Sequence, residues 1–112
     1  MTAEVYCATV LYPFAPGVDF DADRYAREIA PRYAQLLGDN CRGFEVREGQ
    51  TSPVRPHPDN VCIASFWVRS AEAFGASLGS APMKALMAEI DAFSSIRPIR
   101  QFDVCRVARY PG

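Results

Sequence analysis

Three tyrosine hydroxyl groups in the N-terminal third of the chain could hold a small organic molecule. Tyr12 ends a run of β-branched and aromatic residues at Pro13. Its phenol could donate a hydrogen bond to a ligand carbonyl, although a hydroxyl at the wet end of a core aromatic is equally ordinary. Tyr25 and Tyr33 stand two turns apart on a helical stripe and flank Ile29, so all three side chains could line one cleft. The same spacing is typical of a packing face, which is the favoured interpretation for Tyr33.

Trp67 and Asp103 are candidates from two other segments. Trp67 is either the floor of an apolar pocket or part of a dimer core, and strand parity places Ile63 and Ser65 on its face. Asp103 is a carboxylate inside an apolar strand run, and burial would raise its pKa and suit it to catalysis. Pairing with an arginine, or exposure to solvent, is the favoured interpretation for Asp103.

No metal, phosphate or cofactor motif accompanies these residues, so we expect neither a metal nor a cofactor. Any reaction would then be proton transfer, isomerisation, cyclisation or elimination, with phenols orienting a carbonyl. Arg27 and Glu28 are interpreted as a solvated helix face. His57 lies between two prolines of a loop, which is typical of a surface residue and not of a haem ligand.

The four cysteines form no CxxC pair, so a zinc site is not expected. We interpret them as reduced, small apolar core residues, because free cysteine is among the most buried residue types. They are Cys7, Cys41, Cys62 and Cys105.

The composition describes one ordinary globular domain over residues 1–112. The 12 basic and 13 acidic side chains nearly balance, which argues against nucleic acid as a partner, because phosphate binding needs clustered basic residues in excess. No apolar run approaches the roughly 20 residues of a membrane span, and the N-terminus lacks the pattern of a signal peptide. We therefore expect a cytoplasmic protein that contacts neither membrane nor nucleic acid.

The elements that must position the candidate residues follow a βαββαβ order. Strands are predicted at 5–12, 41–48, 61–68 and 97–107, a helix at 21–37, a proline-rich loop at 49–60, and two short helices between 70 and 90. This order predicts an α+β, ferredoxin-like fold, in which a four-stranded antiparallel sheet carries its helices on one face.

Local signals set the ends of the predicted helices. Asp21 is predicted to cap the first helix, with Phe20 packing on Tyr25, and Gly38 is predicted to end it. Pro31 lies inside this helix and is expected to bend it, because proline has no backbone N–H to donate. The two later helices are predicted to begin after serine caps, at Ser70 and Ser80.

The strand at 61–68 is apolar on both faces, which makes it a central strand. One face carries Ile63 and Trp67, and the other carries Cys62 and Phe66. Two helical crossovers can cover only one face of the sheet, and 49% of this small chain is apolar. A second copy of the chain is the simplest cover for the other face, so we expect a homodimer.

Segments in both halves of the chain resemble the EthD family, named for a role in ethyl tert-butyl ether degradation, within the dimeric α/β-barrel superfamily. The segments are Val10-Leu-Tyr-Pro13, Phe20-Asp-Ala-Asp-Arg-Tyr25, Pro31, Leu36-Leu-Gly38, Ser70-Ala-Glu-Ala-Phe74, the helix from Met83 to Ile90, and Ile96-Arg-Pro-Ile99. The resemblance covers nearly the whole chain. It rests on the order and spacing of these segments together.

The resemblance implies a ferredoxin-like protomer whose sheet packs against that of a partner, with the helices outside. It also implies a small-molecule cleft between the sheet and the helices of each protomer. Superfamily members include isomerases, cyclases, monooxygenases and haem enzymes. The leading hypothesis is therefore a homodimer that binds a small, largely apolar organic molecule between the first helix and the sheet.

One departure from the family pattern bears on catalysis. A histidine commonly stands two residues before the helix proline, on the face that looks into the cleft, and here that position is Ile29. Isoleucine cannot transfer protons, so chemistry that depends on this histidine is in doubt. The alternative hypothesis is a non-catalytic binding or accessory protein, and a third is a haem or flavin monooxygenase of the same superfamily.

Overall fold

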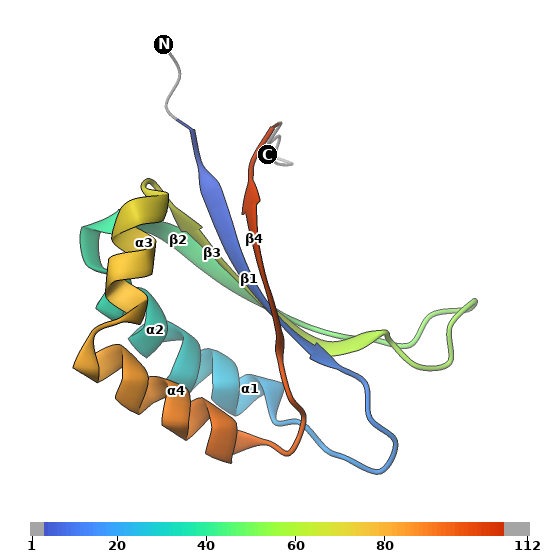
Figure 1. Ribbon diagram of the computed structural model, residues 1–112. Coiled ribbons are helices and arrows are strands. Elements are labelled where there is room, and N and C mark those ends of the chain that lie inside the picture. The colour runs from blue at the N-terminus through green and yellow to red at the C-terminus, as the bar shows by residue number, and fades with distance from the viewer. Residues whose placement is uncertain (1–3, 107–112) are drawn as a thin grey trace.

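Four antiparallel strands form one sheet in the computed structural model, which describes residues 4–106 (Figure 1). The strands are β1 (Tyr6–Pro13), β2 (Cys41–Glu48), β3 (Asn60–Val68) and β4 (Ile99–Val104), in the spatial order β2-β3-β1-β4. All neighbouring pairs run antiparallel. This is the predicted βαββαβ, ferredoxin-like arrangement, and the predicted starts of the first three strands are correct to within one residue.

The helices all lie on one face of the sheet (Figure 1). In chain order they are α1 (Ala22–Arg24), the π-helical turn η1 (Tyr25–Ile29), α2 (Ala30–Leu37), the 3-10 turn η2 (Gly38–Asn40), α3 (Ala71–Leu78) and α4 (Ala81–Phe93). None of the helices in this described part of the chain combines the length and apolar character needed to cross a bilayer.

The predicted helix caps are confirmed. The Asp21 carboxylate accepts a hydrogen bond from the backbone N–H of Arg24 at 3.0 Å, and the rings of Phe20 and Tyr25 lie 5.7 Å apart. The hydroxyls of Ser70 and Ser80 accept hydrogen bonds from backbone N–H groups at the starts of α3 and α4. Each cap pairs one of the donors that a helix start leaves free.

The first helix is continuous from Ala22 to Leu37 but changes its winding before Pro31. The N–H of Ala30 donates to the carbonyl of Tyr25, five residues back, which defines the π-turn. Proline at this point has no N–H for the α-helical ladder, and a π-turn is one way in which a helix absorbs such a break. The expected distortion is therefore present. Gly38 ends the helix with a φ of +64°, where glycine has no Cβ penalty.

The last strand is shorter than the predicted 97–107. It runs over Ile99–Val104, since Pro98 has no N–H to donate to the neighbouring strand. Backbone pairing continues to the N–H of Cys105, which donates to the carbonyl of Val5 at 2.8 Å. Val107, the predicted end of the strand, lies outside the described residues.

The two faces of the sheet differ in cover. Away from the strand ends, side chains that alternate along β1 and β3 toward the helices are at most 5% exposed, and they are Ala8, Val10, Tyr12, Cys62, Ala64, Phe66 and Val68. The opposite, helix-free face presents Leu11, Ile63 and Trp67, which are only partly covered. The predicted parity of β3 is confirmed. All four cysteines are free thiols; Cys62 is fully buried and Cys41 packs against the core, so the prediction that all four are core residues is wrong for Cys7 and Cys105.

The helical layer depends on buried side chains of α4. Leu86 is fully buried, so replacing it with alanine should lower the free energy of unfolding by about 2–5 kcal/mol through lost burial and the cavity left behind. The control Lys84→Ala removes an exposed side chain of the same helix and should change stability by no more than about 0.5 kcal/mol. Urea unfolding followed by circular dichroism measures both. Equal effects would contradict the observed packing of α4.

Candidate functional site

A cavity of about 370 Å³ lies on the helix-covered side of the sheet, against its β1–β4 edge. Strands β1 and β4 form one wall, helices α3 and α4 form the other, and α2 contributes one tyrosine. The lining residues are Ala8, Thr9, Val10, Tyr33, Phe74, Leu78, Met87, Asp91, Arg100, Gln101 and Phe102. Most of this lining is apolar, with a few polar groups among it, as in small-molecule sites generally.

Two stacked aromatic rings belong to the lining of this cavity. Phe74 of α3 and Phe102 of β4 stack with ring centroids 5.1 Å apart and an interplanar angle of 15°. Phe102 also stacks with Tyr6 of β1, at 5.4 Å and 11°. The wall is accessible because β4 is an edge strand, which leaves Phe102 41% exposed. Because these rings stack on one another, they present mainly their edges, which are still apolar contact area for a ligand.

Arg100, Asp91 and Tyr33 supply the polar side chains with functional chemistry. A terminal N–H of Arg100 donates to the sulfur of Met87 at 3.5 Å, and a thioether is a weak acceptor. No ion pair joins Arg100 to a carboxylate among residues 4–106. The guanidinium therefore stands at the cavity with most of its donors available.

Burial controls the ionisation of the phenols nearby. Burial raises the pKa of Tyr33 to about 12, and the positive charge of Arg100 opposes this rise. Burial also raises the pKa of Tyr12, and the positive charge of Arg100 opposes this rise. The pKa of Tyr25 is raised by burial and then by Tyr12. All three phenols are therefore neutral near pH 7, and they can donate hydrogen bonds but do not act as bases.

Of the tyrosines predicted to line a cleft, only Tyr33 reaches this cavity. Tyr12 and Tyr25 are each 1% exposed and pack edge to face, with ring centroids 5.2 Å apart. The Tyr12 hydroxyl has no hydrogen-bond partner among the described residues. These two tyrosines form, together with Phe20 and Phe93, an aromatic cluster between the sheet and the helices.

Ile29, Trp67 and Asp103 do not join Tyr33 either. Ile29 is 5% exposed and faces α4 in a separate surface hollow. Strand parity directs Trp67 and Asp103 to the helix-free face of the sheet, so neither lines this cavity, and Trp67 stands where the alternative of a dimer-core residue would place it. Asp103 is exposed and accepts a hydrogen bond from the side chain of Gln101 at 2.9 Å, which agrees with the favoured interpretation of exposure to solvent.

The sequence interpretation did not single out Arg100, Asp91, Phe74 or Phe102 as site residues. The last strand does carry a usable signal, because Arg100 and Phe102 are two residues apart and therefore lie on the same face of the strand. Their position at the cavity depends on the register that sets Arg100 opposite Val10, and a sequence pattern does not specify which strand β4 joins.

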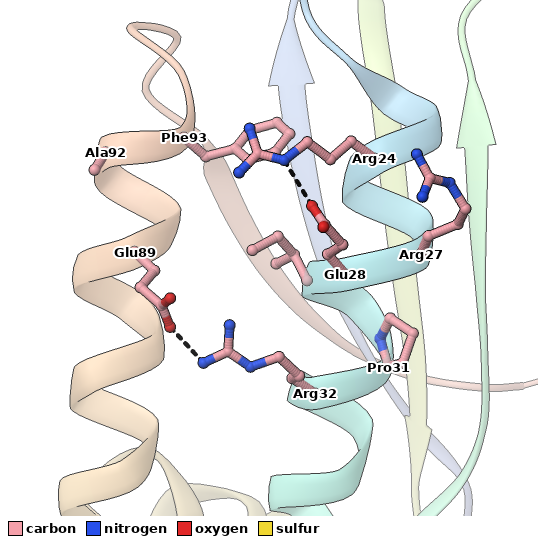
Figure 2. Close-up of a pocket in the computed structure, with 9 residues that line it drawn as sticks. Arg24, Arg27, Glu28, Pro31, Arg32, Glu89, Ala92 and Phe93 are labelled. Carbon is pink, nitrogen blue, oxygen red and sulfur yellow. Dashed lines mark hydrogen bonds and ion pairs between the residues drawn. The ribbon is translucent and has the colours of Figure 1, made fainter.

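A second hollow, of about 690 Å³, lies on the outer surface between α4 and the first helix (Figure 2). Figure 2 shows Arg24 and Arg32 reaching from the first helix toward α4. Arg24 pairs with Glu28 at 2.6 Å and lies over the ring of Phe93, and Arg32 pairs with Glu89 across the two helices.

These ion pairs make the outer hollow a less suitable ligand site than the cavity. Arg27, the third arginine of this hollow, pairs with Asp23 at 2.9 Å. Arg27 and Glu28 are exposed, as expected for a solvated helix face. An anionic ligand would have to compete with carboxylates already in place. His57, also exposed, stacks on Phe14 at 4.4 Å, away from both hollows.

Comparison with known proteins identifies the fold and the family resemblance. No protein-family model and no curated protein sequence matches the chain. Among solved structures, the chain is similar to an EthD-like protein from Ralstonia eutropha JMP134. The two share 26% sequence identity and a TM-score of 0.85, with 96% of this chain and 97% of that chain covered.

Two more distant structures share the fold. One is an ethyl tert-butyl ether degradation (EthD) family protein from Bacillus halodurans C-125, with 14% identity, a TM-score of 0.68, and 88% of this chain and 95% of that chain covered. The other is SnoaB, a cofactor-independent oxygenase from Streptomyces nogalater, with 12% identity, a TM-score of 0.66, and 96% of this chain and 97% of that chain covered.

The sheet topology and one-sided helices define an α+β, ferredoxin-like protein of the kind found in these structures. The chain is EthD-like, as its sequence motifs predict.

The raised pKa of Tyr33 predicts a loss of stability in alkali. Its pKa rises from 10.0 to about 12 on folding, so the unfolded chain gives up this proton first as the pH increases. The free energy of unfolding should therefore be unaffected by this group below about pH 10 and fall between about pH 10 and 12. Tyr33→Phe should show a shallower fall, measured by urea unfolding across this range. Equal slopes in both proteins would contradict the burial of this phenol.

Proposed function

We propose that this EthD-like chain binds a small, largely apolar organic molecule in the cavity between β1, β4 and helices α3 and α4. The single observation that supports this most strongly is an apolar cavity of about 370 Å³ that also presents Arg100, Asp91 and Tyr33. Its volume falls in the range of known small-molecule sites. The location differs from the expected cleft beneath the first helix, which contributes only Tyr33.

Three side chains at the cavity can take different roles in a proton transfer. Tyr33 is neutral near pH 7 and can donate a hydrogen bond to a carbonyl oxygen of the ligand. The charge of Arg100 would stabilise negative charge that develops on that oxygen, and the carboxylate of Asp91 can accept a proton. We propose isomerisation, cyclisation or elimination by this route, in steps that use only side chains of the chain.

Binding without turnover is the second candidate function. It is favoured by the packing of Tyr12 and Tyr25, since two of the phenols expected to act on a ligand are held in the core. Ile29 faces the outer hollow, so a histidine at that position would also lie away from the cavity. Substituting Asp91→Asn separates the two functions, because it removes the proton acceptor. Turnover would then fall with binding retained, whereas a binding protein has no turnover to lose.

The helix-free face of the sheet is proposed to pair with the same face of a second copy. Leu11, Ile63 and Trp67 form an apolar strip along β1 and β3 on this face, and no helix among residues 4–106 covers it (Figure 1). Sheet-to-sheet packing would bury these side chains.

The free thiols of the cysteines fit the reducing cytoplasm, which is the compartment we propose.

Filling the cavity should weaken the binding of an apolar probe. Leu78→Trp adds a large ring at the cavity wall, and it should weaken binding of 2-naphthamide about tenfold or more. The control Ala92→Trp adds the same ring at the outer hollow and should leave the affinity unchanged. Isothermal titration calorimetry measures both. The proposed site is wrong if the control variant loses binding and the Leu78 variant keeps it.

A charge on the helix-free face should dissociate the dimer. The chain has a mass of 12.4 kDa, so sedimentation equilibrium should give about twice that value for the unmodified protein. Ile63→Arg places an unpaired charge between the sheets and should give the mass of one chain. The control Ala76→Arg adds the charge on exposed α3 and should remain dimeric. A single-chain mass for the unmodified protein would refute this proposal.

A further inference from the structure

The arginine residues at the two hollows differ in their partners. In the outer hollow, Arg24, Arg27 and Arg32 are each paired with a carboxylate of the chain. At the cavity, Arg100 has no such partner within the described residues, and its one hydrogen bond goes to the sulfur of Met87. The outer arginines are therefore explained by helix-to-helix and within-helix pairing, while that explanation does not apply to Arg100.

The position of Arg100 brings its charge to an apolar surface. It pairs with Val10 across β1 and β4, and Phe102, two residues further on, lies on the same face of the sheet. Phe102 stacks with Phe74, and both rings line the same cavity as the guanidinium. A ligand whose apolar body contacts these side chains would place its polar end toward Arg100.

The chemistry of guanidinium specifies the polar end. Its planar fork of N–H donors matches the two oxygens of a carboxylate in a bidentate pair, and it has no acceptor to offer a ligand donor. Tyr33 adds a neutral hydroxyl donor to the same cavity. We infer that the molecule bound in this cavity is an apolar carboxylic acid, whose carboxylate pairs with Arg100. This inference rests on the proposed function, because it assigns the ligand class of that cavity.

Asp91 is the opposing charge at this cavity. It lines the same space as Arg100 but forms no ion pair with it, so no nitrogen of Arg100 lies within 4.0 Å of its carboxylate. A ligand carboxylate can therefore approach Arg100 without displacing Asp91. The negative charge of Asp91 still weakens the attraction, so its removal should favour an anionic ligand.

The test compares two probes of nearly the same shape, 2-naphthoate and 2-naphthamide, which differ in charge. Calorimetric titration of the full chain at neutral pH should show that 2-naphthoate binds about tenfold more tightly or better, as expected for a charge-assisted pair. Arg100→Met should remove this preference and leave the affinity for 2-naphthamide within about twofold. Asp91→Asn should strengthen 2-naphthoate binding about twofold or more.

Two control variants keep this result interpretable. Arg97→Met removes a nearby exposed arginine that does not line the cavity, and it should retain the full preference for 2-naphthoate. Arg100→Lys keeps the charge without the planar fork and should retain only part of the preference. Thermal unfolding of each variant confirms that it is folded.

The possible failures are distinguishable. If the unmodified chain binds both probes equally, or if Arg100→Met keeps the preference, the carboxylic acid inference is wrong while the cavity remains a binding site. If the unmodified chain binds neither probe at millimolar concentration, the proposed function fails and this inference fails with it.

Discussion

The antiparallel pairing of β1 with β3 is the constraint on which the rest of this structure depends. It sets Val10 opposite Ala64 and Tyr12 opposite Cys62, so that apolar side chains from both strands project to the same face. Because strand side chains alternate, the same register sends Leu11 and Ile63 to the other face. One register therefore creates both the helix-covered core and an apolar strip on the opposite face, which no helix of residues 4–106 covers.

The cavity follows from what lies beside this central pair. β4 is an edge strand that pairs only with β1, and it brings Arg100 and Phe102 to the helix-covered side. α3 has 8 residues, while α4 has 13 and carries Met83, Leu86 and Ile90 into the core. The space between the edge strand and these two helices is bounded by small side chains of β1 and by the stacked rings of α3 and β4.

The arginines at the two hollows differ in whether a carboxylate of the chain already pairs with them. Arg32 and Glu89 join the first helix to α4, and Arg24 is held by both Glu28 and Phe93 (Figure 2). Exposed pairs of this kind contribute little to stability, but they occupy the donors that an anion would need. At the cavity, the one side-chain hydrogen bond of Arg100 within the described residues goes to a thioether, which makes the smaller hollow the better site for an anionic group.

Local chemistry in the sequence by itself determined the elements of this protein. The caps at Asp21, Ser70 and Ser80, the turn at Gly38 and the apolar run of β3 predicted the order of elements and the ferredoxin-like fold, because these signals act between residues a few positions apart. Tyr33 could be placed on an inward stripe for the same reason.

Only the tertiary structure decided which side chains share a cavity. Arg100 meets Tyr33 and Phe74 through the pairing of β4 with β1 and the docking of α3, which join residues far apart in the sequence. Tyr12 and Tyr25, equally plausible from their spacing, became packed against each other. A periodic pattern specifies the face of an element on which a residue lies, but the partner of that face is set by long-range packing.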